Sequence, residues 1–267
     1  SGIRNSFIGY GAGANATTAD YSIGIGQSAL GIGVLTGDHN IAFGNGAGYD
    51  LTSGTYNILS GFQAGYNVTT GNGNVFSGYQ TGENATTASF GISIGYSAIG
   101  VGIMTGTDNT AIGRQAGNDL TSGEYNNFMG YQAGYNATTG DSNIAIGREA
   151  IGLGVLTGTN NVVLGYQAGY DLTSGDHNIL SGFQAGSNIT TGTGNIFQGN
   201  EAGEFATTAS YGIAIGYEAI ASGVMTGSDN TAIGRIAGHD LTSGAFNNFI
   251  GYFAGANATT ATNTIAI

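Results

Sequence analysis

The chain of 267 residues contains no cysteine, proline, tryptophan or lysine. Without cysteine there are no disulfides and no thiol chemistry, and the cellular compartment stays open. Charged residues make up only 7% of the chain, and four arginines are the only strong cations against a net charge of −12. Nucleic acids and anionic membrane surfaces attract clustered cations, so neither is expected as a partner.

Long apolar runs are missing as well. No run of eighteen apolar residues is present, so no membrane insertion is expected. The chain begins at Ser1 without a signal peptide and stops inside a repeat at Ile267. We therefore interpret it as a processed or truncated piece, or as the ordered part of something longer.

Glycine is abundant, with 52 residues, and 40% of the chain is hydrophobic. The glycine that closes segments such as Asn143-Ile-Ala-Ile-Gly147 recurs every 17 or 18 residues. We name it the anchor glycine, and its positions are Gly9, Gly26, Gly44, Gly61, Gly78, Gly95, Gly113, Gly130, Gly147, Gly165, Gly182, Gly199, Gly216, Gly234 and Gly251. A fixed period of this length is typical of solenoids. The sequence therefore predicts an all-β parallel β-solenoid or β-roll of about 15 coils.

A longer period is superimposed on the coil. Seven coils, or 121 residues, separate Gly9, Gly130 and Gly251, which indicates segment duplication more than a recurring partner surface. We treat residues 1–267 as one repeat array with superrepeats at 9–129 and 130–250 and a partial one at 251–267.

Asparagine recurs four residues before the anchor glycine. Stacked side-chain amides can form hydrogen bonds from coil to coil, so this column predicts an asparagine ladder. Its members are Asn40, Asn57, Asn74, Asn109, Asn126, Asn143, Asn161, Asn178, Asn195, Asn230 and Asn247.

The segment before the anchor has the alternation of a strand. Isoleucine is frequent three and one residues before the anchor, as in Ile144 and Ile146, and such neighbours share one face. We expect that face to line the coil interior. Alanine stands three residues after the anchor in fourteen of fifteen coils, Thr81 being the exception, which indicates a tight interior.

The column two residues before the anchor is then expected to face outward. A 17-residue coil encloses a thin core, and oligomerisation commonly compensates for a small core. We therefore predict self-association, as a trimer or a longer bundle, through the large apolar members of this column. They are Phe7, Leu59, Phe76, Phe128, Leu180, Phe197 and Phe249.

Four coils have 18 residues and an apolar corner in place of the usual Asx-x-Thr turn. They contain residues 29–37, 98–106, 150–158 and 219–227. Such a corner is either buried locally or exposed as a contact patch, and burial against a neighbouring chain is the simpler interpretation.

The segments Asn143-Ile-Ala-Ile-Gly147 and Asn230-Thr-Ala-Ile-Gly234 resemble head repeats of trimeric autotransporter adhesins. The fuller unit, with Arg-Glu-Ala and a later Thr-Gly, is similar to repeat arrays of phage tail fibres and bacterial surface proteins. The resemblance implies a left-handed roll that trimerises side by side. The autotransporter repeat is shorter, near fourteen residues.

These observations predict a structural or adhesive fibre segment and not an enzyme. The resemblance implies an extracellular place, on a cell or virion surface, and a glycan or protein receptor. Catalysis needs convergent titratable groups, whereas His39, His177 and His239 are interpreted as solvated turn residues. The dense ligand pattern of calcium-binding solenoids is missing, so Ca²⁺ is only a minor alternative and no cofactor is expected.

Two other functions stay open. Thr or Ser precedes the turn Gly or Ala of each coil, and a regular threonine column is typical of ice-binding solenoids; the candidate ice or ligand face is Thr70, Thr87, Thr105, Thr139 and Thr157. A carbohydrate-binding surface would use exposed rings such as Tyr79, Tyr131 and Tyr166. Asn-x-Thr sequons at Asn15, Asn67, Asn84, Asn136, Asn188 and Asn257 are explained by turn chemistry, so glycosylation would be incidental.

Overall fold

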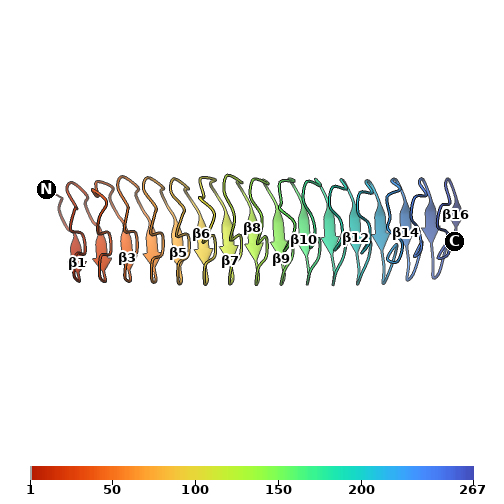
Figure 1. Cartoon of the computed structure of the whole chain (residues 1–267), viewed down its shortest axis with the longest axis horizontal. Helices are drawn as coiled ribbons and strands as arrows, with labels where there is room; N and C mark the ends of the chain where they lie inside the picture. Colours follow the sequence, from red (N-terminus) through yellow and green to blue (C-terminus); the bar gives the residue numbers. More distant parts are fainter. Residues whose placement is uncertain (1) are drawn as a thin grey trace. The chain divides into compact units, whose positions relative to one another are not determined.

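The computed structural model describes residues 2–267 and divides into two compact units, Ser1–Thr139 and Gly140–Ile267. Each unit is a parallel β-solenoid in which successive coils stack and each coil contributes one short strand (Figure 1). The described residues contain no helix. The prediction of an all-β parallel solenoid of about 15 coils is therefore confirmed.

The strands contain three residues each, except the two-residue β16. Those of the first unit are β1 (Ser6–Ile8), β2 (Ile23–Ile25), β3 (Ile41–Phe43), β4 (Ile58–Ser60), β5 (Val75–Ser77), β6 (Ile92–Ile94), β7 (Thr110–Ile112) and β8 (Asn127–Met129). Those of the second unit are β9 (Ile144–Ile146), β10 (Val162–Leu164), β11 (Ile179–Ser181), β12 (Ile196–Gln198), β13 (Ile213–Ile215), β14 (Thr231–Ile233), β15 (Asn248–Ile250) and β16 (Ile265–Ala266).

Within each unit, every strand pairs in parallel with the strand of the next coil. In the register between β10 and β11, Val162 faces Ile179 and Val163 faces Leu180. Because both strands precede an anchor glycine by the same number of residues, equivalent positions become partners. The sequence columns are therefore physical columns that run along the solenoid axis of each unit.

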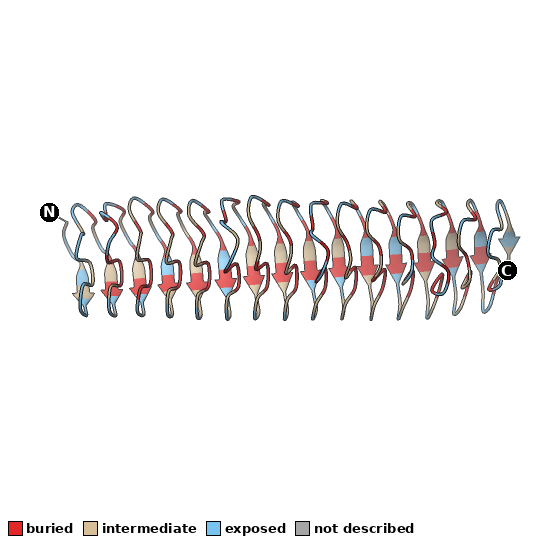
Figure 2. Ribbon diagram, in the orientation of Figure 1, coloured by how far each residue is buried: buried red, intermediate tan, exposed pale blue. Residues whose placement is uncertain are grey.

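The middle residue of each strand points into the coil, and its two neighbours point outward. Figure 2 shows this as a red centre on most strand arrows, and Phe76, Phe128 and Phe197 are fully buried. The prediction that this column is an outward oligomer interface is therefore wrong. The corrected positions are Leu59, Phe76, Phe128, Leu180, Phe197 and Phe249, all buried, and Phe7, which is partly buried. The alternation was correctly recognised, but its inner and outer faces were exchanged.

A pair of polar residues shows what the interior column contacts. Thr81 is the one residue other than alanine three positions after an anchor, and its hydroxyl lies 2.7 Å from that of the buried Ser93. One superrepeat later, both places hold alanine, at Ala202 and Ala214, and both are buried. The two columns therefore face each other across the core, where a hydroxyl needs a hydroxyl partner.

The anchor glycines allow the coils to approach closely. Gly216 has a φ of +134°, and an added Cβ would lie 2.5 Å from the carbonyl oxygen of Gly234 in the next coil. The Gly234 amide in turn donates to the Ile215 carbonyl at 2.8 Å. A side chain at this column would therefore separate two coils that are joined by a backbone hydrogen bond.

The asparagine ladder is confirmed. The Nδ2 atom of Asn178 donates to Oδ1 of Asn161 at 3.0 Å and to the Gly192 carbonyl at 2.8 Å. Oδ1 of Asn178 accepts from both nitrogens of Asn195, at 3.0 and 2.9 Å. Side-chain bonds of the same kind link Asn40 to Asn57, Asn57 to Asn74, Asn109 to Asn126, Asn143 to Asn161 and Asn230 to Asn247. The ladder satisfies the turn carbonyls as well as its own amides.

The apolar corners of the 18-residue coils combine burial and exposure. Leu30, Ile99, Ile151 and Ile220 take the place of the usual glycine four residues after the anchor, adopt positive φ and are fully buried or nearly so. A β-branched residue is strained in this conformation, and burial of its side chain offsets that cost. The next apolar residues of the same corners lie on the surface, as described below.

Candidate functional surfaces

In each unit, the outward side of the strands exposes apolar side chains. We name it the sheet face and define it as the residues three and one positions before each anchor glycine. Its exposed apolar members are Ile8, Ile25, Phe43, Ile58, Ile92 and Ile94 in the first unit and Ile146, Leu164, Ile179, Ile196, Ile233, Ile250 and Ile265 in the second. Individual exposed side chains of this kind are ordinary, but contiguous columns mark a contact surface.

One edge of the sheet face carries stacked rings and arginines. We name the residues that directly follow the anchor glycines the tyrosine–arginine edge. Tyr79 and Tyr96 stack with centroids 5.0 Å apart, and the Arg114 guanidinium lies 5.7 Å from the rings of both Tyr96 and Tyr131. In the second unit, Arg235 lies between Tyr217 and Tyr252 at 5.5 and 5.8 Å, and Arg148 lies over Tyr166 at 5.5 Å. These cation–π contacts place the guanidinium groups against the neighbouring rings of the edge.

The stacked rings bear on the carbohydrate-binding alternative. Sugar recognition by aromatic residues uses the ring face, yet Tyr79 and Tyr96 are nearly parallel, at 4°, and cover each other. Tyr166 is covered by Arg148 on one face and by Phe183 on the other. Ring edges and hydroxyl groups are what these columns present to solvent, which does not favour sugar stacking.

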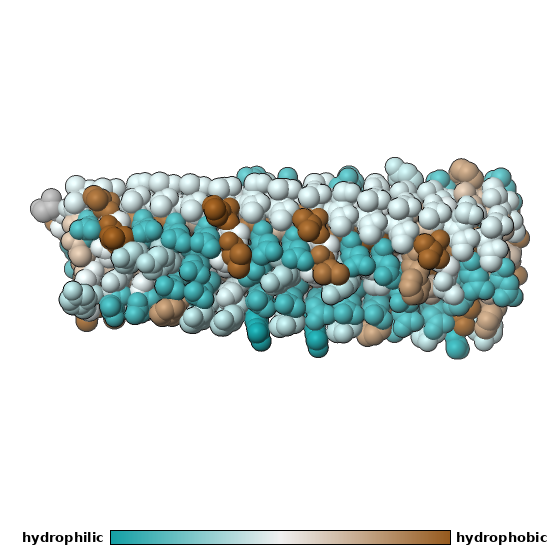
Figure 3. All heavy atoms as spheres, viewed as in Figure 1, coloured by the Kyte–Doolittle hydropathy of each residue, from teal (hydrophilic) through white to brown (hydrophobic). Residues whose placement is uncertain are grey.

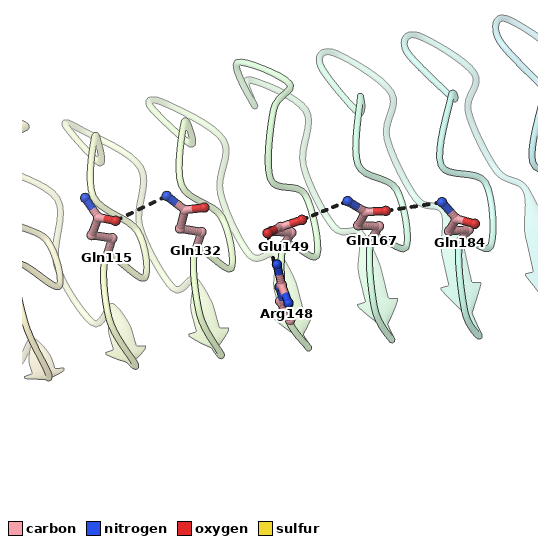
Figure 4. Close-up of polar contacts among 6 residues, drawn as sticks. All are labelled: Gln115, Gln132, Arg148, Glu149, Gln167 and Gln184. Atoms are coloured by element: carbon pink, nitrogen blue, oxygen red, sulfur yellow. Dashed lines mark hydrogen bonds and ion pairs between the residues drawn. The ribbon is translucent and has the colours of Figure 1, made fainter.

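The column two residues after the anchor glycines contains glutamine and glutamate residues that adopt positive φ. Gln132 donates to Gln115 at 3.2 Å, and Gln167 donates to Glu149 at 2.7 Å (Figure 4). Glu149 also accepts from Arg148 at 3.2 Å, so this arginine has an acidic partner within its own chain. The column stabilises the stack by hydrogen bonds between side-chain amides and carboxylates of successive coils, as the asparagine ladder does in the interior.

In the second unit, Glu201 and Glu218 of the same column line an acidic cavity. The cavity has a volume of about 400 Å³ and is lined by Glu201, Glu204, Phe205, Glu218, Ala221, Ser222 and His239. His239 Nε2 lies 3.9 Å from Glu218, and its Nδ1 lies 2.7 Å from Asp240. Burial raises the pKa of Glu204, and the charges of Glu201 and Glu218 raise it further.

We expect Glu204→Gln to stabilise the second unit at pH 7. Folded Glu204 keeps its proton to a higher pH than the unfolded chain, whose ordinary pKa is 4.5. The folded state therefore binds more protons in this window, and stability falls as pH rises from 4.5 through the raised pKa. Urea unfolding should show a gain at pH 7 that disappears by about pH 4.

The matched control is Glu83→Gln, since Glu83 precedes Glu204 by one superrepeat. Burial raises the pKa of Glu83, a hydrogen bond from Gln80 lowers it, and no second carboxylate acts on it. Its substitution should give a smaller gain. Equal gains for the two variants, or a gain that persists unchanged at pH 4, would show that the carboxylate cluster does not destabilise the fold.

The apolar corners form small patches on the surface. Figure 3 shows apolar spots on an otherwise mostly hydrophilic face, and the exposed corner residues are Ile32, Val34, Val101, Ile103, Leu153, Val155 and Val224. They stand apart from one another, unlike the columns of the sheet face. Their burial against a neighbouring chain stays untested, and the association proposed below does not depend on it.

The threonine columns divide into a structural one and an exposed one. Thr69 and Thr173 donate their hydroxyl groups to the carbonyls of Thr86 and Thr190 in the next coils, at 3.0 and 2.9 Å. The adjacent column, which contains Thr70, Thr87, Thr105, Thr139 and Thr157, is exposed. Since the hydroxyl groups of the first column are used within the fold, the ice-binding alternative rests on the single exposed row.

The histidines do not form a site with one another. His39 stacks between Tyr21 and Tyr56, each 4.9 Å away, and His177 is exposed. The described residues contain no group of three or more His, Cys, Asp or Glu side chains arranged to hold a metal ion. Among the sequon residues, Asn67 donates to Asn84 at 2.6 Å, and Asn84 donates to the Gly100 carbonyl at 2.9 Å. These bonds agree with the predicted turn chemistry.

Comparisons with protein-family models, with curated proteins and with solved structures find no match to this chain. Among residues 2–267, no helix is long and apolar enough to cross a membrane. The surfaces themselves therefore carry the functional argument. Sequence reasoning named the asparagine ladder and the threonine column as such, but missed the sheet face, because it assigned those isoleucines to the interior.

Proposed function

We propose that this chain is a structural segment of an extracellular adhesive fibre, and that it associates with further copies of itself through the sheet face. The observation that carries the proposal is the exposure of isoleucine columns on the outside of every unit, as at Ile94 and Ile179, which are 39% and 46% exposed. Covering such columns removes apolar area from water at about 25 cal/mol per Å².

Three further points support this function. The coil repeats through the described chain without an inserted domain, which suits a shaft or an adhesin head better than a catalytic domain. The resemblance to trimeric adhesin heads supports three copies per assembly. The acidic, lysine-free surface suits an exposed, soluble fibre.

The test is the association of the protein in solution. Serine replaces isoleucine on the sheet face at Ile92, Ile94, Ile179 and Ile196. Since each buried isoleucine contributes roughly 1–2 kcal/mol, the four changes should raise the dissociation concentration at least about 100-fold in sedimentation velocity. Electron microscopy should show elongated assemblies for the unaltered protein.

The control makes the same chemical change away from the sheet face. Serine replaces the exposed corner residues Ile32, Val101, Ile103 and Val155. This variant should associate like the unaltered protein. A wild-type chain that stays monomeric at all concentrations, or equal losses in both variants, would refute association through the sheet face.

A further inference from the structure

The two edges of the sheet face carry opposite charge at the same coils. Strand β7 has Arg114 two residues beyond its last residue and Asp108 two residues before its first. Strand β14 is flanked in the same way by Asp229 and Arg235. Of the residues five positions before an anchor, Asp108 and Asp229 are the acidic ones, and both stand at coils where arginine follows the anchor.

Aspartate suits the backbone here, since Asp108 and Asp229 both adopt a φ of +59°, but among the described residues their carboxylates hold no backbone group in place. Asp38 and Asp176, one position earlier in their coils, accept backbone N–H bonds from Asp20 and Thr159 at 2.7 and 2.6 Å. Asp108 and Asp229 are exposed, and among the described residues their carboxylates take part in no hydrogen bond or ion pair. They are therefore free to meet a cation from outside the chain.

The arginines of these coils are also without an acid of their own. Arg114 and Arg235 stack between tyrosine rings, and in the described part of the chain neither forms an ion pair. A three-residue strand, about 10 Å long, and the bends at its two ends separate each arginine from the aspartate of the same coil. The two charges therefore do not pair within one molecule, and no ion pair joins them.

A second copy of the chain can supply the missing ion-pair partners in one relative orientation. If two sheet faces meet with their solenoid axes parallel and in register, a rotation about that axis brings the arginine edge of one copy against the aspartate edge of the other. The same holds for a ring of three. If the axes are antiparallel, like edges meet, and arginine faces arginine while aspartate faces aspartate. Charge complementarity thus favours the parallel arrangement.

We propose that copies of this chain associate in parallel and in register, and that Arg114 and Arg235 of each copy pair with Asp108 and Asp229 of its neighbour. The inference rests on the proposed association through the sheet face and adds orientation and register to it. The apolar residues of the sheet face set these weakly, since most coils carry at least one of them and a shift by one coil still buries apolar area. Charges placed at single coils penalise such a shift.

The test is a charge swap in the full chain, measured by sedimentation at low salt. One variant combines Arg114→Asp with Arg235→Asp, a second combines Asp108→Arg with Asp229→Arg, and a third carries all four changes. The first two place like charges at both edges, so each should dissociate at least about tenfold more readily, a change of about 1.4 kcal/mol. The fourfold variant restores opposite edges and should associate within about threefold of the unaltered protein.

The variants also separate local pairing from net charge. The second variant reduces the magnitude of the net charge of −12 and yet should associate more weakly, and the fourfold variant keeps the charge unchanged. Mixing the first two variants should restore association, and 1 M salt should weaken all these differences. The proposed register is wrong if the fourfold variant associates as poorly as the other two variants. It is also wrong if charge reversal has no effect while the sheet-face serines still dissociate the protein. In both cases the association through the sheet face stands. A monomeric wild-type chain would refute both.

Discussion

Replacing Gly216 by alanine is expected to lower the free energy of unfolding of its unit by more than about 4 kcal/mol, one of the largest effects of any single methyl group in this chain. Two costs combine at this position. The φ of +134° is rarely adopted by residues with a Cβ, and the added carbon would lie 2.5 Å from the Gly234 carbonyl oxygen. The neighbouring coil cannot withdraw without breaking its bond to the Ile215 carbonyl.

Gly11→Ala separates these costs. Gly11 also has a positive φ, of +69°, but an added Cβ would meet no atom closer than 3.5 Å. Only the backbone strain is expected here, about 1–3 kcal/mol. Urea unfolding by far-UV circular dichroism, with hydrogen exchange at the altered coil, measures both. Equal losses for the two variants would mean that the approach of the coils does not explain the anchor glycine.

Asn178→Ala should destabilise the second unit by about 3–6 kcal/mol, because three buried N–H and C=O groups lose their bonds to Asn178 at about 1–3 kcal/mol each before relaxation. These are the Gly192 carbonyl, the Asn195 backbone N–H and one N–H of Asn195 Nδ2, whose other N–H keeps the Ala209 carbonyl. The site is fully buried, so water cannot replace the lost bonds without opening the coil.

Asn200→Ala is the matched control. Asn200 lies in the same unit on the exposed tyrosine–arginine edge, so the same substitution should change stability by less than about 0.5 kcal/mol. Unfolding by urea compares the two variants directly. A loss for Asn178→Ala no larger than that of the control would show that the ladder is a by-product of stacking and not a source of stability.

The period and the ladder were predictable because they depend only on spacing. Once Gly147 and Gly165 are equivalent, Asn143 and Asn161 must stack, and a small amide in every coil has few other roles. The absence of helix among residues 2–267 follows from the period-two alternation and the density of glycine. None of these conclusions requires knowledge of which side of the strand is inside.

The direction of the strand faces was not decided by alternation. In a three-residue strand such as β10 (Val162–Leu164), the middle and both flanking residues are apolar, so a period of two fits either choice. The deciding signal was volume. The middle column alternates large and small residues, as in Phe76 and Ala111, which is how a confined interior is filled. The isoleucine columns show no such compensation.

Two polar exceptions, Thr81 and Ser93, also indicate which face of the strand is inside. Thr81 and Ser93 are polar together in one superrepeat and alanine together in the next. Two columns that change together within one chain are in contact, which places the middle of the strand opposite the alanine column. The charged edges of the sheet face could not be recognised before its direction was known, since Asp108 and Arg114 are then only turn residues.

Cysteine accessibility tests the outward sheet face and its role in assembly most directly, because the chain has no cysteine of its own. Single cysteines are introduced at Leu164 on the sheet face, at the adjacent buried Val163, and at Ser174 on the exposed turn. In dilute protein, the thiol at 164 should react as fast as that at 174, while the thiol at 163 stays unreactive. At concentrations where the protein assembles, only the thiol at 164 should become protected. If it reacts equally fast at both concentrations, or if the thiol at 163 reacts instead, the account is contradicted.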